Sequence, residues 1–594
     1  MKTFFKMLFA SCLGVFIAMF LVFMIAMVMM VGMLSNLGGS KTVYTLSDNT
    51  VLQLDLSGSI SDRETTDYMS GLFLSNDKSS GLDDILKAIK TAKENDKICG
   101  IYIKTGILAA GYSTLEPIRK ALIDFKESGK FVVAYGDYIM QEAYYTFAMA
   151  DKVILNPQGM FMLYGMTAGM PFLKGTFDKL GVKFEVFRVG TFKAAVEPYT
   201  ETRMSDANRE QVSSYTNSIW SHLLAGISES RDISVDNLNR YADEYMTLSA
   251  SEKSVVYGLV DTLMYAPDVK DYIKKLAGVE GDDEVKFATV ANINAIPAKK
   301  QKPAKDKIAI LYAEGAIMPE ESQNFQSGSI ISDKEYVKEL VKLKDDKNVK
   351  AVVFRVNSPG GSGYTSEQIW RAVSELKKVK PVIVSMGNYA ASGGYYISCA
   401  ADVIVAEPTT LTGSIGGFAL VPEAEKLFQK IGMTFDGVNT NKHSDWGIPS
   451  KPLNAEESQI MQDYLVRFID VFYTRCADGR SKTKEEIDAV GQGRVWTGKQ
   501  ALQNGLVDRL GSLDDAIKIA AERAELTEYD VNTYPEMKDP FTQFMEKLSG
   551  GSVKASLVKS FLGDNVYQQY LMANRKTTPV DFIQAIMNPE INIQ

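Results

Sequence analysis

Apolar and polar residues along the chain predict strands and helices in alternation. Short runs rich in β-branched residues, IAILYA (308–313), AVVFRV (351–356) and PVIVSMG (381–387), have the length of buried strands. Between the second and third runs, apolar residues recur at helical spacing in SEQIWRAVSELKKV (366–379). Strands that alternate with helices imply βα units around a mostly parallel sheet, so we expect an α/β fold.

The N-terminal segment is uncharged and nearly all apolar. No charged residue occurs from residue 7 to residue 40, and Lys2 and Lys6 precede this run. A membrane-spanning helix needs about 20 apolar residues, whereas the apolar part of a cleavable secretory signal has only about 7–15. We therefore predict one uncleaved transmembrane helix, with the two lysines in the cytoplasm and the rest of the chain outside it.

The sequence is an internal duplication. Residues 100–193 lie over residues 351–444 without a gap, and AYYTFAMADKVILNP, for example, meets GYYISCAADVIVAEP. A register held over this length is the signature of a repeated domain. Each half is therefore predicted to be one copy of the same α/β domain.

Domain boundaries follow from this register and from composition. The segment between the copies is rich in proline and lysine and has no apolar period, as expected of a linker. We predict a cytoplasmic tip and transmembrane anchor in residues 1–40, a first copy in 41–295, a linker in 296–307, a second copy in 308–530, and a helical extension in 531–594.

Composition excludes several classes of function. The net charge is −8 and no long basic cluster occurs, which argues against nucleic-acid binding. The four cysteines never form a CxxC pair, so neither a zinc site nor a disulfide framework is expected. Only two histidines, His222 and His443, could take part in catalysis.

A single serine distinguishes the two copies at the start of one predicted helix. Ser392 follows a predicted strand in YAASGGYY, and Gln141 stands at the matching position of the first copy. A serine here could simply cap the helix. The small residues on either side instead favour close approach of another backbone, and the N–H of Gly393 could bind an oxyanion.

A second difference follows the preceding strand. The second copy has NSPGGSG, with Gly360 and Gly361, where the first copy has Ala109 and Ala110. A Pro-Gly-Gly sequence can be an ordinary tight turn. It can also expose backbone N–H groups that bind an oxyanion together with Gly393.

A serine nucleophile needs a base. His222 lies on an apolar helix and His443 on a polar loop, so a histidine base is not favoured. A lysine has a reference pKa of about 10.4 and must be buried to be neutral. Lys193, in FKAAVEP, has apolar neighbours, and its counterpart in the second copy is Ser444. Each copy thus keeps one partner of a possible Ser–Lys pair and lacks the other.

The motifs SPGGSG, YAASGGYYIS, TGSIGG and FKAAVEP together resemble the long, duplicated form of the signal peptide peptidase A family, which are membrane-anchored bacterial serine proteases. The resemblance covers essentially the whole chain. It implies two domains similar to crotonases and Clp protease subunits, with Ser392 as nucleophile and Lys193 as general base.

The resemblance also implies a cellular setting. It implies a homotetramer in the bacterial inner membrane, with the catalytic part on the periplasmic side and no metal or organic cofactor. The expected substrates are released signal peptides and other apolar peptides, including misfolded exported proteins. Ser414 aligns with Leu163 of the first copy, and we expect its hydroxyl to hold the lysine amine, unless it is only a turn serine.

Two other functions fit parts of the sequence. A crotonase-type enzyme acting on acyl-thioesters would suit the fold and the glycines, but not the anchor or the Ser–Lys pair. A non-catalytic membrane scaffold would suit a decayed site such as that of the first copy. The presence of Ser392, Lys193, Gly360 and Gly361 argues against it.

Overall fold

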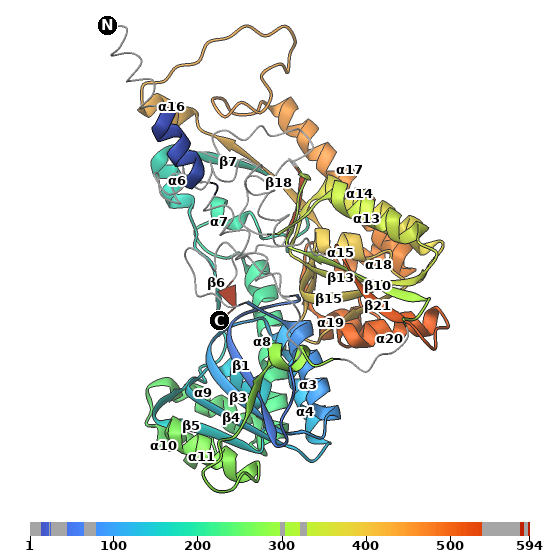
Figure 1. Ribbon diagram of the computed structural model, residues 1–594. Coiled ribbons are helices and arrows are strands. Elements are labelled where there is room, and N and C mark those ends of the chain that lie inside the picture. The colour runs from blue at the N-terminus through green and yellow to red at the C-terminus, as the bar shows by residue number, and fades with distance from the viewer. Residues whose placement is uncertain are drawn as a thin grey trace, which may run out of the picture.

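Two mostly parallel sheets, one in each copy, form the body of the molecule (Figure 1). The structure is a computed structural model that describes residues 13–22, 24, 44–63, 79–297, 303–320, 329–536, 583–586 and 592–593. The first sheet has the order β2–β1–β3–β4–β5–β8, and β9 also pairs with β1. Its strands are β1 (Thr50–Ser61), β2 (Ser79–Gly81), β3 (Ile98–Ala109), β4 (Phe131–Ile139), β5 (Lys152–Phe161), β8 (Thr262–Leu263) and β9 (Phe287–Thr289).

The second sheet has the order β19–β17–β15–β13–β10–β21, and β16 joins β15 to β20. Its strands are β10 (Lys307–Glu314), β13 (Val349–Ser358), β15 (Val382–Ala391), β16 (Val403–Ala406), β17 (Leu411–Gly413), β19 (Val495–Thr497), β20 (Arg509–Leu510) and β21 (Asp530–Tyr534). The path β9–β1–β3–β4–β5–β8 in the first sheet thus recurs as β21–β10–β13–β15–β16–β20, parallel throughout. This repeat confirms the predicted α/β class and the duplication.

Helices connect the strands and cover the sheets. Those of the first copy are α3 (Leu82–Glu94), α4 (Tyr112–Lys126), α5 (Gln141–Phe147), α6 (Lys174–Leu180), α7 (Glu197–Thr200), α8 (Asp206–Arg231), α9 (Val235–Asp243), the 3-10 turn η1 (Met246–Leu248), α10 (Ser251–Val256), α11 (Ala266–Leu276) and α12 (Val290–Asn294). Those of the second copy are α13 (Asp333–Asp345), α14 (Gly363–Lys377), α15 (Gly393–Ser398), α16 (Glu425–Lys430), α17 (Ala455–Arg480), α18 (Lys484–Val490), α19 (Gly498–Asn504) and α20 (Leu513–Arg523).

The sheets are buried on both faces, which is why their strands are apolar almost without a break. In β10, Ile308 and Ile310 pack into a core that α20 covers, whereas Ala309 and Leu311 face the larger core on the opposite side. The spacing that predicts helix 366–379 is also explained, because the apolar side chains of α14 are buried in that larger core.

A third sheet joins the copies and lies beside Ser392. Its order is β12–β11–β14–β22–β18–β7. Its strands are β7 (Lys183–Val189), β11 (Ala316–Ile317), β12 (Ile330–Ile331), β14 (Gly360–Ser362), β18 (Gly417–Glu423) and β22 (Ile583–Ile586). Strand β7 of the first copy pairs antiparallel with β18 of the second along its whole length, from Lys183 to Val189. A separate two-stranded sheet pairs β6 (Ala168–Gly169) with β23 (Asn592–Ile593).

The structure describes parts of both ends of the chain, where an anchor and a helical extension are predicted. The predicted anchor lies mostly outside the described residues, of which 13–22 are helical. Within the described part of the chain, every helix is too short or too polar to span a bilayer. In the predicted helical extension 531–594, the described secondary structure consists of strands (most of β21, then β22 and β23), because these segments add to existing sheet edges.

Buried polar contacts hold the copies against each other. Arg355 in β13 forms a two-pronged ion pair with Asp62, at 2.8 and 3.0 Å, and both side chains are almost fully buried. Its remaining nitrogen donates to Ser385 Oγ and to the Met386 carbonyl. The charge of Arg355 is therefore neutralised only when the second copy sits on the first.

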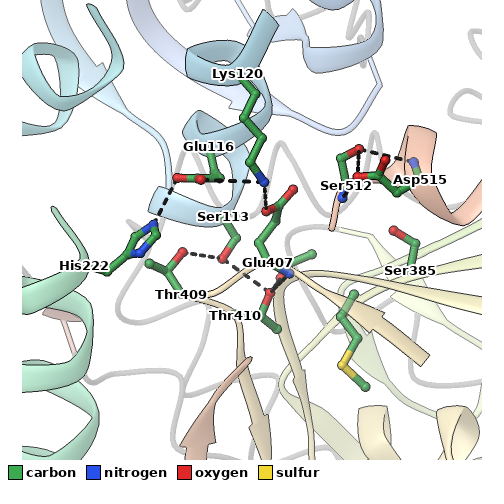
Figure 2. Close-up of polar contacts among 12 residues, drawn as sticks. Ser113, Glu116, Lys120, His222, Ser385, Glu407, Thr409, Thr410, Ser512 and Asp515 are labelled. Atoms are coloured by element: carbon green, nitrogen blue, oxygen red, sulfur yellow. Dashed lines mark hydrogen bonds and ion pairs between the residues drawn. The ribbon is translucent and has the colours of Figure 1, made fainter. Parts of the chain in front are cut away.

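A second group of contacts crosses the same boundary and is shown in Figure 2. Lys120 Nζ on α4 lies 2.9 Å from Glu407 Oε2, and Ser113 Oγ lies 2.9 Å from Thr409 Oγ1. Glu407 is buried, and that burial raises the pKa of its carboxyl even though Lys120 opposes the change. Apolar contacts reinforce the boundary, since Ala391 packs into the first copy's core and Phe187 into the second copy's.

We predict that Asp62→Asn lowers the free energy of unfolding by about 3 kcal/mol, because the buried guanidinium of Arg355 loses its counter-charge. Urea denaturation followed by tryptophan fluorescence measures this change. The matched control is Glu375→Gln, which removes the surface ion pairs with Arg371 and Lys378 and should change stability by less than about 0.5 kcal/mol. Equal effects from the two substitutions would contradict the role assigned to the buried pair.

Candidate active site

Ser392 lies at the junction of β15 and α15, in a strained backbone conformation. Its φ and ψ are 55° and −114°, a region that non-glycine residues rarely adopt and that costs of order 1–3 kcal/mol. Its N–H donates to the Gly413 carbonyl and its carbonyl accepts from Tyr396, so the backbone is fixed on both sides. The hydroxyl does not cap α15, which removes the capping interpretation.

The next two residues allow this sharp turn. A Cβ at Gly394 would lie 2.7 Å from the Ser358 carbonyl oxygen, so the end of β13 approaches the helix start closely. The N–H of Gly393 is among the first N–H groups of α15, which no preceding helical turn accepts. The small residues around Ser392 therefore serve the close approach that the sequence predicts.

Lys193 reaches Ser392 because strand β7 of the first copy pairs with a strand of the second copy. The strand ends at Val189, opposite Gly417 of β18, and Lys193 follows after one short turn. There Phe192 N–H donates to the Gln492 carbonyl, at 2.8 Å. A Cβ at Gly493 would lie 2.7 Å from Lys193 Cβ, so only a glycine lets the two loops meet.

The two predicted partners are in direct contact within one chain. Lys193 Nζ lies 2.7 Å from Ser392 Oγ. The amine also contacts Ser414, whose hydroxyl is 3.0 Å and whose carbonyl oxygen is 3.2 Å from Nζ. A neutral amine has two N–H bonds and one lone pair, so it can donate to both Ser414 oxygens and accept the proton of Ser392.

Burial favours that neutral form. Lys193 is 1% exposed and Ser392 is 0% exposed. Burial lowers the pKa of the Lys193 amine from 10.5 to about 7, because the charged form loses its hydration. Glu197, the nearest acid in the sequence, does not oppose this: its carboxylate accepts hydrogen bonds from Ser205 and Asn208.

The predicted oxyanion glycines lie in β14, which replaces the predicted turn with a short strand. The φ of Gly360 is 100°, and its N–H donates to Ser358 Oγ at 3.1 Å. Gly361 pairs with Ile317 of β11, and a Cβ there would lie 1.9 Å from the Ile317 carbonyl oxygen. Both positions therefore require glycine on geometric grounds.

A segment of the chain itself covers the site. Strand β22 lies antiparallel to β14 on one side and to β18 on the other, with Ile586 opposite Gly360. Strands β14 and β18 therefore form a groove, here called the working groove, that accepts one extended strand. In an extended peptide bound this way, the backbone groups pair alternately with β14 and with β18.

In the first copy, buried side chains of other types occupy the positions that match Ser392 and Ser414. Gln141 is fully buried, and its amide nitrogen donates to the Gly165 carbonyl at 2.9 Å. Leu163 is also buried where the second copy has Ser414. In the second copy Ser444, the counterpart of Lys193, lies in an exposed loop. Each copy has thus lost one member of the pair, as the sequence predicts.

Neither histidine takes part in this arrangement. His222 Nε2 lies 3.2 Å from Glu116 Oε2 (Figure 2), and His443 Nδ1 lies 3.2 Å from Glu457 Oε1.

Sequence reasoning missed two residues that hold the lysine loop. Gln211 on α8 donates to the Phe192 carbonyl and accepts from Val495, and Gly493 makes room for Lys193. The GQG sequence at 491–493 was the available signal.

Comparison with known proteins agrees with the duplicated fold. The model of Peptidase family S49 matches residues 124–280 and again residues 374–527. "Protease 4" of Salmonella typhi is 38% identical over 531 residues, which cover 85% of this chain and 83% of that protein. "Serine protease SPPA, chloroplastic" of Arabidopsis thaliana is 32% identical over 84% of this chain and 73% of its own length.

Two further matches were found. "Protease 4" of Haemophilus influenzae is 33% identical over 85% of this chain and 84% of that protein. A solved structure of a ClpP1 mutant from Listeria monocytogenes covers 35% of this chain and 94% of its own, at 15% identity and a TM-score of 0.24. The two family matches, one in each copy, and the relatives at 32–38% identity show that this chain belongs to peptidase family S49, as a serine protease of the long, duplicated form.

Proposed function

We propose that this serine protease is a membrane-anchored endopeptidase that uses a Ser392–Lys193 dyad to degrade released signal peptides and other apolar peptides. The observation that carries the proposal is the 2.7 Å contact between a fully buried lysine amine and the hydroxyl of a strained serine. A lysine without a carboxylate partner, placed against a hydroxyl, has the properties of a base rather than of a structural cation.

The first step activates the serine. Neutral Lys193 accepts the proton of the Ser392 hydroxyl while Oγ attacks the carbonyl carbon of a peptide bond. Ser414 holds the amine in place through its hydroxyl and its carbonyl. The charge that develops on the substrate oxygen is stabilised by the backbone N–H groups of Gly393 and Gly361, whereas the Gly360 N–H already donates to Ser358 Oγ.

The second step releases the products. Lys193 gives its proton to the amine nitrogen as the C–N bond breaks, which leaves an ester on Ser392. Water then attacks this ester with Lys193 as base, and the acid product leaves. The reaction needs only these protein groups and water, so we propose no metal or organic cofactor.

The shape of the site supports extended peptides as substrates. Strand β22 is the example: its backbone pairs with both β14 and β18 next to Ser392. A peptide that enters as a strand is selected by its backbone, and its alternate side chains face the walls. Val421 of β18 and Ile317 of β11 are buried in the second copy's apolar core, and the preference for apolar signal peptides is proposed on the family resemblance.

The cellular setting is part of the proposal. The uncharged run from residue 7 to residue 40 is long enough to anchor the chain in a membrane. The preceding lysines would keep that end in the cytoplasm and place both copies on the periplasmic side of the bacterial inner membrane. Crotonase- and Clp-like domains, the homotetramer, and signal peptides as partners are proposed on the family resemblance.

We predict that Ser392→Ala and Lys193→Met each lower kcat/KM for an apolar peptide ester by at least about a thousandfold, because either change removes the reacting pair. Lys193→Met should also raise the free energy of unfolding at pH 7, since an apolar side chain avoids the cost of burying an amine. Full activity in either folded variant would rule out the dyad. An inactive but folded wild type would favour a scaffold.

We predict that kcat/KM rises tenfold per pH unit below about pH 7 and levels off above it, because Lys193 must be neutral to accept a proton and burial lowers its pKa to about 7. The measurement is a pH–rate profile from pH 5.5 to 9.5 with an ester whose own hydrolysis is subtracted. A rise centred near pH 10 would show that the amine is solvated in the working enzyme.

We predict that Ser414→Ala lowers kcat about tenfold with little change in KM, because the amine loses one of its two holding contacts and keeps the other. The matched control is Ser366→Ala, which removes an equally buried hydroxyl that donates to the carbonyl of Ser362, the N-cap residue of α14. Equal losses in the two variants would assign Ser414 to general packing instead.

A further inference from the structure

The degenerate first copy retains one wall of a groove. By the register that aligns the copies, Ala168 and Gly169 of β6 correspond to Ala419 and Leu420 of β18. Strand β18 is a wall of the working groove. Its counterpart β6 is therefore the same structural edge in a copy that has lost its serine, its glycine pair and its active-site chemistry.

This edge also has a strand added to it. Strand β23 pairs antiparallel with β6, with Ile593 opposite Ala168 and Asn592 opposite Gly169. Strand β22 pairs antiparallel with β18, with Ile583 opposite Ala419. The equivalent alanines of the two copies thus pair with two segments of one tail, which run in the same direction along each copy.

The two added strands are close in the sequence. Residue 592 follows residue 586 by six positions, which in an extended chain span at most about 20 Å. Strand β22 ends with Ile586 opposite Gly360, and β23 begins with Asn592 opposite Gly169. One extended peptide of about a dozen residues is therefore long enough to occupy both copies.

A cavity of about 450 Å³ adjoins β6. Its lining includes four large apolar side chains, Met166, Met170, Phe172 and Met204, together with the cations Arg203 and Arg209. No acidic residue lines the cavity within the described part of the chain. The buried hydroxyl of Thr216, which also lines it, has no hydrogen-bond partner there among the described residues. Such a surface suits an apolar segment that carries a negative charge.

We propose that β6 and this cavity form a second, non-catalytic peptide site. It takes the part of an extended apolar peptide that lies on the C-terminal side of the bond at Ser392, and an acidic group of that part meets Arg203 and Arg209. The position relative to the cleaved bond rests on the proposed function, whereas binding itself does not. The first copy then binds one part of a long substrate and keeps the rest aligned in the working groove.

Binding is measured without cleavage, on the full chain that carries Ser392→Ala. A second substitution, Asn592→Pro, removes one N–H of β23 and weakens docking of the chain's own tail. Two fluorescent peptides are compared by anisotropy: a short one with the sequence of residues 583–588, and a long one with that of residues 583–594, which adds Glu590 and the β23 residues. We expect the long peptide to bind roughly tenfold more tightly, which equals about 1.4 kcal/mol.

Further substitutions locate the added affinity. Gly169→Pro removes a backbone N–H from β6. The matched control Gly169→Ala keeps this N–H, and its added Cβ meets nothing within 4 Å. The pair Arg203→Glu and Arg209→Glu reverses the charge of the cavity. We expect Gly169→Pro and the charge reversal to reduce binding of the long peptide to that of the short one. Gly169→Ala should leave both affinities unchanged, and unchanged binding of the short peptide shows that each variant is folded.

The outcomes separate the two proposals. Equal affinities for the long and short peptides, or a long-peptide advantage that survives both Gly169→Pro and the charge reversal, would overturn the second site. Tighter binding of the long peptide together with no hydrolysis by the wild-type chain would overturn the proposed function and leave the second site in place. With both proposals correct, the wild-type enzyme has a lower KM for the long peptide, and Gly169→Pro removes that difference.

Discussion

The pairing of β7 with β18 is the constraint on which the site depends. It carries a strand of the first copy across to the second and places Lys193 against Ser392, although 199 positions separate them in the sequence. A lysine that belongs to the same loop as its serine could swing away into solvent. Here the loop is fixed by a backbone hydrogen bond from Phe192 to Gln492 and by the close contact at Gly493, and both hold the amine against Ser392.

The same arrangement favours the neutral form of the amine, which the proposed mechanism requires of its base. Desolvation is the cause of its lowered pKa, and the carboxylate of Glu197, which could have restored the charge, is taken up by other donors. The site is thus destabilised locally in two ways, by a buried amine and by a strained serine. This local cost persists because the surrounding structure fixes the backbone of Ser392 and the loop of Lys193.

Much of the fold and of the pair could be predicted from the sequence. Buried strands are apolar on both faces and α14 has apolar residues at helical spacing, so the α/β class follows from local pattern. The pair of Ser392 and Lys193 follows from comparing the copies, because each keeps what the other has lost. The crossing of β7, the partner of Arg355 and the strands β22 and β23 could not be predicted. They depend on pairings between segments hundreds of residues apart, which leave no periodic signal in either segment. The tail in particular suggested helices, and the described part of it forms strands because free sheet edges were available.

The distance between the two halves of the site also sets an order in time. Synthesis proceeds at roughly 5–20 residues per second, so Lys193 is made about 10 to 40 seconds before Ser392. Under the proposed mechanism, the first copy has no nucleophile to activate throughout that interval. The second copy, even when complete, has no base until β7 docks on β18. By the same mechanism, a nascent chain becomes able to cleave peptides only when the two copies have assembled.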